Sequence, residues 1–227
     1  MKKLAVLAGA SLALACATQK AEGPKQAEVL DVDYGRLAPN QTAMVEAARR
    51  NEMAARDDLA RAQVRLRQAD HEMELAQAEA PAVEADRKRA EAEAKMASES
   101  REPTAVDRAA TAKQAADLHE RAAKAHADYA GRLKEACAAE MTAAQRRLDA
   151  STARVGQAKL RAMQTAGVPA AQKYDAMSFD KAVSDATAKQ TQAEVEALQK
   201  RQQAVTAERQ WDDLQNQLRT TTSAMAR

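Results

Sequence analysis

Histidine side chains are the first residues of this chain whose type and spacing could support metal chemistry. His119 and His126 are seven residues apart, which places them on nearly the same face of a helix but about 10.5 Å apart along its axis. One metal ion could not bind both directly with bonds of about 2 Å. We therefore expect two solvated surface histidines, and the sequence predicts no metal site.

Other motifs for catalysis or cofactor binding are missing from the sequence. It has no Gly-rich phosphate loop, no C-x-x-C and no H-E-x-x-H, and it lacks the strands on which most nucleotide sites are built. Ser, His and Asp residues occur, but no fixed spacing brings them together. The chain is expected to have no enzymatic activity, no cofactor and no evident small-molecule substrate.

The clearest motif is at the N-terminus, MKKLAVLAGASLALAC. Lys2 and Lys3 precede an apolar run from Leu4 to Leu14, and Ala15-Cys16 follows, an order typical of a signal peptide at residues 1–15. The apolar run is too short for a transmembrane helix, which needs about twenty residues. The chain is therefore predicted to be exported.

The segment that ends at Cys16 resembles the lipobox of bacterial lipoproteins. The resemblance implies that Cys16 carries fatty acyl chains such as palmitate and becomes the mature N-terminus. Because Ala17 follows rather than Asp, it also implies the periplasmic face of the outer membrane. Ala13 departs from the Leu that this family usually has. Ala13-Leu14-Ala15 also fits an ordinary A-x-A cleavage site, which would release a soluble periplasmic protein.

Net charge and the second cysteine add two expectations. Removal of Lys2 and Lys3 lowers the 35 basic residues to 33, equal to the 33 acidic ones, so the mature chain gives no argument for nucleic acid as a partner. With Cys16 lipidated, Cys137 is the one other thiol. We expect it to be a small apolar residue that faces another helix, and an intermolecular disulfide is the alternative.

Composition predicts an all-α fold. Alanine occupies 59 of 227 positions and only five residues are aromatic, which suits long helices at close distance better than a compact globule. Acid-before-base pairs at i, i+4 repeat along the chain and favour exposed helical faces over disorder, as in Glu52/Arg56, Asp57/Arg61, Glu84/Lys88 and Glu120/Lys124. We expect long antiparallel helices in an elongated coiled-coil bundle or helical hairpin.

Proline and glycine divide the mature chain into a tether and one helical domain at residues 40–227. Residues 16–39 are expected to form the lipidated cysteine and a flexible tether. Three helical tracts should follow, at about 40–99, 104–166 and 170–224, with a kink or short break at Pro81. Gly167 should cap the second tract, and Pro169 should prevent its continuation.

Two groups of apolar residues are candidate contact surfaces. Met141, Leu148 and Val155 are each seven residues apart, which is coiled-coil spacing. Trp211, Leu214 and Leu218 are the bulkiest cluster of the third tract and share one helix face. They are expected to bind a partner helix or a second copy, or else to close the core of the bundle itself.

Beyond the lipobox, the layout from Cys16 onward resembles alanine- and charge-rich helical lipoproteins of bacteria. The chain departs from the major outer-membrane lipoprotein, because it ends in Ala226-Arg227 and not in a lysine attached to peptidoglycan. It also lacks the strand-built domains of efflux adaptor proteins. The resemblance implies a non-catalytic structural or scaffolding lipoprotein that binds other envelope proteins. The alternatives are an accessory subunit of an envelope-spanning secretion, efflux or motility machine, and a ligand-binding or enzymatic domain.

Overall fold

The computed structural model describes residues 28–35, 37–100 and 102–225, and every element of this part of the chain is helical. A short helix α1 (Asp31–Tyr34) precedes the long helices α2 (Ala43–Ala78), α3 (Ala80–Ser100), α4 (Pro103–Thr165) and α5 (Ala176–Met225). Single 3-10 turns at Pro39–Gln41 and Pro169–Lys173 lead into α2 and α5. Within the described ranges, no helix is both long enough and apolar enough to cross a bilayer. The predicted all-α, elongated antiparallel fold is confirmed.

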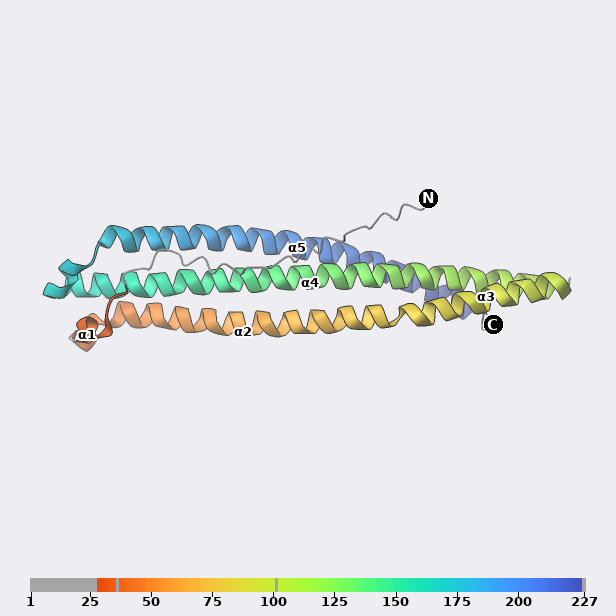
Figure 1. Cartoon of the computed structure of the whole chain (residues 1–227), viewed down its shortest axis with the longest axis horizontal. Coiled ribbons are helices and arrows are strands. Elements are labelled where there is room, and N and C mark those ends of the chain that lie inside the picture. Colours follow the sequence, from red (N-terminus) through yellow and green to blue (C-terminus); the bar gives the residue numbers. More distant parts are fainter. Residues whose placement is uncertain (1–27, 36, 101, 226–227) are drawn as a thin grey trace, which may run out of the picture.

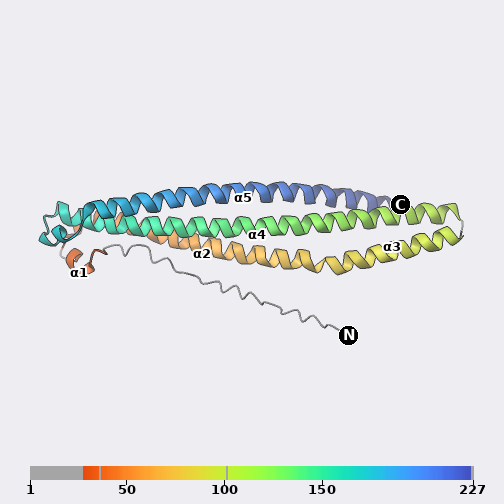
Figure 2. The same ribbon diagram turned by 45° about the horizontal axis from the view of Figure 1, so that its top comes forward.

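Helix α4 is the central element of the rod. Its 63 residues correspond to about 95 Å at 1.5 Å per residue. The collinear pair α2 and α3 packs along one side of α4, and α5 packs along another, while α2 and α5 make almost no contact with each other (Figures 1 and 2). α5 ends before the turn between α3 and α4, so that end of the rod consists of two helices only (Figure 1). The bundle is therefore an open layer of helices built on α4.

Small side chains at every seventh residue form the contact surfaces. On α2 and α3 the buried positions seven residues apart are Ala55, Ala62, Ala69, Ala76, Val83, Ala90 and Ala97. On α4 the same spacing gives Ala109, Ala116, Ala130, Cys137, Ala144, Ser151 and Ala158. A second series on α4, which includes Ala136, Ala143 and Ala150, meets α5, where Ala143 packs with Ala193 and Ala197. Small residues at these positions allow neighbouring helix axes to approach closely.

The break in the first tract and the end of α4 follow from proline and glycine, as predicted, whereas α5 begins at Ala176 and not at about residue 170. The first tract divides at Glu79, two residues before Pro81, and the series of buried alanines continues across this break. Gly167 ends α4 with φ of +67°. Its N–H donates to the Gln164 carbonyl and that of Val168 to the Met163 carbonyl, which is a Schellman motif. α5 then begins at Ala176, where the Asp175 carboxylate accepts from the N–H of Met177.

The segment before α2 differs from the expected flexible tether. Val29 is 1% exposed and packs with Leu160, Met163, Ala171 and Phe179 at the end of α4. Asp31 pairs at 2.8 Å with Lys159, which is itself buried, and Tyr34 packs against Val45. The sequence patterns missed this docking, because it depends on residues more than 120 positions away. Residues 16–27 of the predicted tether and the signal peptide at 1–15 lie outside the described residues.

We call the series of buried alanines between α2 and α4 the seam. Enlarging one of these alanines should force α2 away from α4. Ala62 is 1% exposed, and we expect Ala62→Leu to lower the free energy of unfolding by about 1–3 kcal/mol. Ala60, exposed on the same helix, supplies the matched control Ala60→Leu, which should leave stability nearly unchanged. Urea unfolding followed by circular dichroism measures both. Equal stability of the two variants would contradict the close-packed seam.

Candidate functional site

The most distinctive polar feature is a row of side chains on α4 that point between α2 and α5. We call this row, spaced in steps of seven residues, the ladder: His119, His126, Glu140, Arg147, Arg154 and Arg161. Leu133 occupies the one apolar step. The facing residues of α2 and α3, and Glu79 between them, repeat at the same interval, namely Asp58, Arg65, Glu72, Glu79 and Asp86. A common interval on antiparallel helices lets each rung meet its partner in turn.

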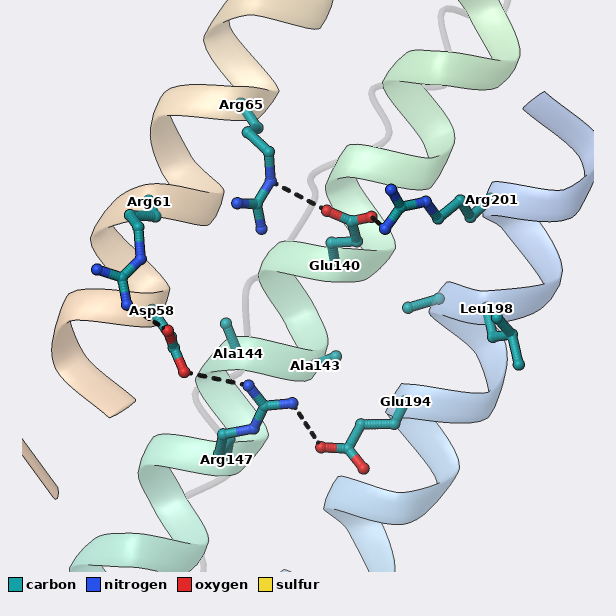
Figure 3. A pocket seen from close by; sticks show the side chains of 11 residues that line it. Asp58, Arg61, Arg65, Glu140, Ala143, Ala144, Arg147, Glu194, Leu198 and Arg201 are labelled. Carbon is teal, nitrogen blue, oxygen red and sulfur yellow. Dashed lines mark hydrogen bonds and ion pairs between the residues drawn. The ribbon is translucent and has the colours of Figure 1, made fainter. Parts of the chain in front are cut away.

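Two rungs of the ladder bridge three helices at once. Arg147 donates one Nη to Asp58 of α2 at 3.2 Å and the other to Glu194 of α5 at 2.8 Å. At Glu140, seven residues before Arg147 on α4, the charges are reversed. Glu140 accepts from Arg65 of α2 at 3.1 Å and from Arg201 of α5 at 3.5 Å (Figure 3). These four contacts link the outer helices, which otherwise hardly touch, through the central one.

Arg154, Arg161 and His119 each join α4 to one neighbour, whereas His126 contacts side chains on both sides of α4. We call the end of the rod where α4 ends and α5 begins its base. Towards this base, Arg154 donates to Thr187 at 3.1 Å and Arg161 pairs with Asp180 at 3.1 Å, both on α5. Towards the opposite end, His119 lies 3.0 Å from Asp86 of α3. The ladder therefore extends along most of α4. Its partners on α2 and α3 and its hydrogen-bonding and ion-pair partners on α5 both repeat at intervals of seven residues.

A groove lies over the two bridging rungs, between α2 and α5. It measures about 460 Å³, and its floor is made of alanines of α4 and α5 while arginines and acids form its walls (Figure 3). The lining consists of Asp58, Arg61, Arg65, Glu140, Ala143, Ala144, Arg147, Glu194, Ala197, Leu198 and Arg201. Arg65 uses only its Nε in the rung to Glu140. The groove can offer polar groups and a shallow apolar floor to another molecule.

Hydrogen bonding keeps the groove charged near neutral pH. Arg61 and Arg147 donate to Asp58 and hold the pKa of its carboxyl below the ordinary value, although partial burial acts in the opposite direction. Hydrogen bonds from Gln190 and Arg147 lower the pKa of Glu194. Glu194 and Asp58 in turn raise the pKa of the Arg147 guanidinium, against the effect of burial. The rung formed by Arg147, Asp58 and Glu194 is therefore a fixed pattern of charge near neutral pH.

His126 is not the surface histidine that the sequence predicted. It is 4% exposed, and its Nε2 lies 2.9 Å from Glu72 Oε1 while its Nδ1 lies 3.0 Å from Glu79 Oε2. The first contact is a hydrogen bond, and the second is an ion-pair contact without hydrogen-bond alignment. Its ring stacks on Trp211 of α5 with centroids 4.3 Å apart and an interplanar angle of 7°. The prediction was wrong because burial here comes from α2 and α5, and the local sequence does not encode it.

The residues of the two predicted apolar contact surfaces differ in burial and in the contacts that they make. Trp211 stacks on His126 and, at 5.4 Å, on Tyr129, so its indole is part of the contact between α5 and α4. Leu214 and Leu218, further along α5, are half-buried. In the other group, Val155 is buried but Met141 and Leu148 are half-buried, since the seam itself is built from alanine. Cys137 is a buried free cysteine, and Cys16 lies outside the described residues.

Sequence reasoning missed the ladder, although a signal for it exists. Asp58, Arg65, Glu72, Glu79 and Asp86 follow one another at intervals of seven, and this pattern becomes meaningful only when set against the same interval on α4. Among the i, i+4 pairs, Glu52/Arg56 and Glu120/Lys124 form at 2.8 and 2.6 Å, and Glu84/Lys88 forms at 3.3 Å. Arg61 instead pairs at 2.6 Å with Asp58, which serves the ladder.

The groove is lined by charged and apolar side chains. Among the described residues, no group of three or more His, Cys, Asp and Glu side chains is arranged to hold a metal ion. The side chains of the groove are paired ions, alanines and the exposed Leu198. Comparison with known proteins adds no relative, since no family model, characterised protein or solved structure matches the chain.

Reversing the charge of a bridging rung should destabilise the bundle. In Arg147→Glu, three acidic groups meet where one cation joined two carboxylates. We expect the free energy of unfolding to fall by about 1–2 kcal/mol at low salt, and by less in high salt, which screens the repulsion. The added substitution Glu194→Arg should recover most of the loss, as measured by urea unfolding.

Arg146→Glu is the matched control for this ladder prediction. Arg146 is adjacent, exposed, and paired only with Asp149 of its own helix at 3.2 Å. Its reversal should change stability much less than that of Arg147. Equal effects of the two reversals, or no recovery in the double variant, would show that the rung does not join the helices energetically.

Proposed function

We propose that this chain is a non-catalytic, lipid-anchored structural protein of the bacterial cell envelope that presents a helical rod to other envelope proteins. The observation that carries the proposal is the combination of a lipobox-like Cys16 with a rod whose N-terminal end is docked. Residues 28–34 pack at the end of α4 that bears Lys159 and Met163. Only residues 17–27 separate this base from Cys16, a distance of at most about 40 Å of chain.

This geometry supports a role as a spacer. A lipid on Cys16 would hold the base close to the membrane surface. The opposite end of the rod, formed by α3 and the start of α4, would then reach up to about 95 Å from the base, the length of α4. The docking of Val29, Asp31 and Tyr34 fixes the point on the rod from which the chain leads back towards Cys16. The rod can therefore hold a bound protein at a defined distance from the membrane.

The groove between α2 and α5 supports a role in binding proteins along the rod. A coiled-coil seam of alanines buries little area per turn, and α4 remains accessible where the two outer helices do not meet. Arginine is enriched at protein interfaces, and the polar, solvent-accessible rim of an interface accommodates ion pairs such as those of the groove. We propose that envelope proteins contact the rod through this groove.

Acylation of Cys16 can be tested by metabolic labelling with a fatty acid. We expect the mature wild-type protein to be labelled and to sediment with membranes. Cys16→Ala should abolish the label and leave precursor or soluble protein, whereas Cys137→Ala, the matched control, should keep it. An unlabelled, soluble wild-type protein would refute the lipid anchor.

Binding through the groove can be tested with a photo-crosslinking amino acid in intact cells. Leu198, 58% exposed in the groove wall, is expected to give one defined crosslinked product. Met53, 64% exposed and not part of the groove, is the matched control and should give none. Identical products from both positions, or none from Leu198, would contradict the assignment of the groove.

A further inference from the structure

His126 lies at the one point where a titratable ring contacts carboxylates next to one helix and an aromatic side chain of another. Its side chain is only 5% exposed. Glu72 belongs to α2, and Glu79 occupies the break between α2 and α3. On the other side, Trp211 of α5 covers the ring face, and Tyr129, one turn along α4, stacks on the same indole. The imidazole of His126, on α4, thus contacts side chains of both α2 and α5.

The geometry fits the protonated ring. Both ring nitrogens lie within 3.0 Å of a carboxylate oxygen, and only the imidazolium carries N–H groups on both nitrogens. A neutral ring would turn a lone pair towards one of the two carboxylates. A cation at 4.3 Å from the indole centroid is also attracted by the negative face of the ring. Protonation therefore favours both sets of contacts at once.

From these contacts we propose that His126 is a pH-operated clasp that fastens the C-terminal part of α5 to the central helix. When protonated, it holds Glu72 and Glu79 on one side and Trp211 on the other. When it loses its proton, one carboxylate loses its partner and the indole loses the cation. The end of α5 then detaches and exposes the alanine face of α4 that it covers. This inference does not rest on the lipid anchor or on the groove.

The surrounding charges point in the same direction. Burial lowers the pKa of His126 and is the largest single influence, but the hydrogen bond to Glu72 and the negative charges of Glu72 and Glu79 together outweigh it and raise the pKa above its ordinary value. From α5, Glu208 and Asp212 act on Tyr129. Of these carboxylates, Glu72 and Glu79 favour the imidazolium.

The other titratable groups nearby change charge at higher pH than the imidazole. Burial raises the pKa of the Tyr129 phenol above 10 and that of the Cys137 thiol above 9. Because the folded state raises the pKa of His126, its stabilising effect is complete below about pH 6.5 and is lost as the pH rises through the folded value. The clasp therefore opens as the pH rises through the folded-state pKa of His126, which lies above the ordinary value.

The attachment of α5 near Trp211 is suited to such control. Trp211 Nε1 is buried without a hydrogen-bond partner, so the stack loses a cation without having a polar contact in reserve. Ala122 and Ala136 flank Tyr129 at intervals of seven on the α4 face that meets α5, and both are buried. Small residues of this kind add little apolar area, so the aromatic stack supplies most of the local hold on α5.

The single tryptophan of the chain makes the clasp directly observable. In the full-length mature protein, a stacked imidazolium should quench Trp211 emission. We expect emission to rise between pH 6 and 9 with a midpoint above 6.5. Amide hydrogen exchange, corrected for its intrinsic pH dependence, should accelerate over the same range in residues 205–222 but not in residues 130–160 of α4.

Two variants of His126 separate the clasp from a general pH effect. His126→Arg keeps a planar cation at all these pH values and should hold α5 docked up to pH 9. His126→Gln has no charge and should give unquenched emission and fast exchange of residues 205–222 even at pH 6. Circular dichroism establishes that both variants fold.

His119→Gln and His71→Gln are the controls, since these side chains are 30% and 70% exposed and pair with other acids. Both should retain the wild-type transition. The inference is overturned if wild-type emission is constant from pH 6 to 9, if either His126 variant keeps the transition, or if exchange in α5 does not follow the fluorescence. Loss of the transition in His119→Gln would also overturn the inference, because it would show that the transition belongs to His119 and not to His126.

Discussion

The close approach of helices through alanine is the constraint on which the rest of this structure depends. A buried alanine at every seventh position lets α2, α3 and α5 lie against α4 without large interlocking side chains. Such a seam is smooth, and sliding one helix by seven residues would place alanine on alanine again. Packing alone therefore specifies the face of each helix but not its position along the neighbour. The register must come from another interaction.

The charged ladder contributes to that register, together with the aromatic contacts of Phe179 and Trp211 towards the two ends of the contact between α4 and α5. If α2 slipped by one heptad, Arg147 would face Arg65 and Glu140 would face Glu72, and a similar slip of α5 would set Arg147 against Arg201 and Glu140 against Glu208. In the opposite direction, Glu140 would meet Asp58 or Glu194. Each native Arg–carboxylate rung is partly exposed and adds only a few tenths to about 1 kcal/mol. Its larger effect is to place like charges opposite each other when a helix slips by one heptad, which disfavours those arrangements of similar packing.

The sequence predicts the elements of this fold better than their contacts. Helices, the break near Pro81 and the cap at Gly167 follow from local preferences, and the structure confirms them. The heptad spacing of Met141, Leu148 and Val155 predicts a helix contact at these residues, because bulky residues usually mark a core. In the structure the contact is made by the alanines between them. The docking of Val29 and the burial of His126 depend on residues far away in the chain. No local pattern could indicate them, although the shared interval of seven could have revealed the ladder.

Aromatic residues are concentrated at two places along the rod, and this distribution has mechanical consequences. At the base, Tyr174 and Phe179 meet edge to face with centroids 6.4 Å apart, and the Tyr174 hydroxyl donates to Asp33. Towards the other end of α5, Trp211 and Tyr129 form the second aromatic contact. Between them, α5 is held by alanines and by partly exposed ion pairs. Because aromatic side chains contribute far more buried area than alanine, α5 is fastened at two points and more weakly held between them. The groove lies in that more weakly held middle section.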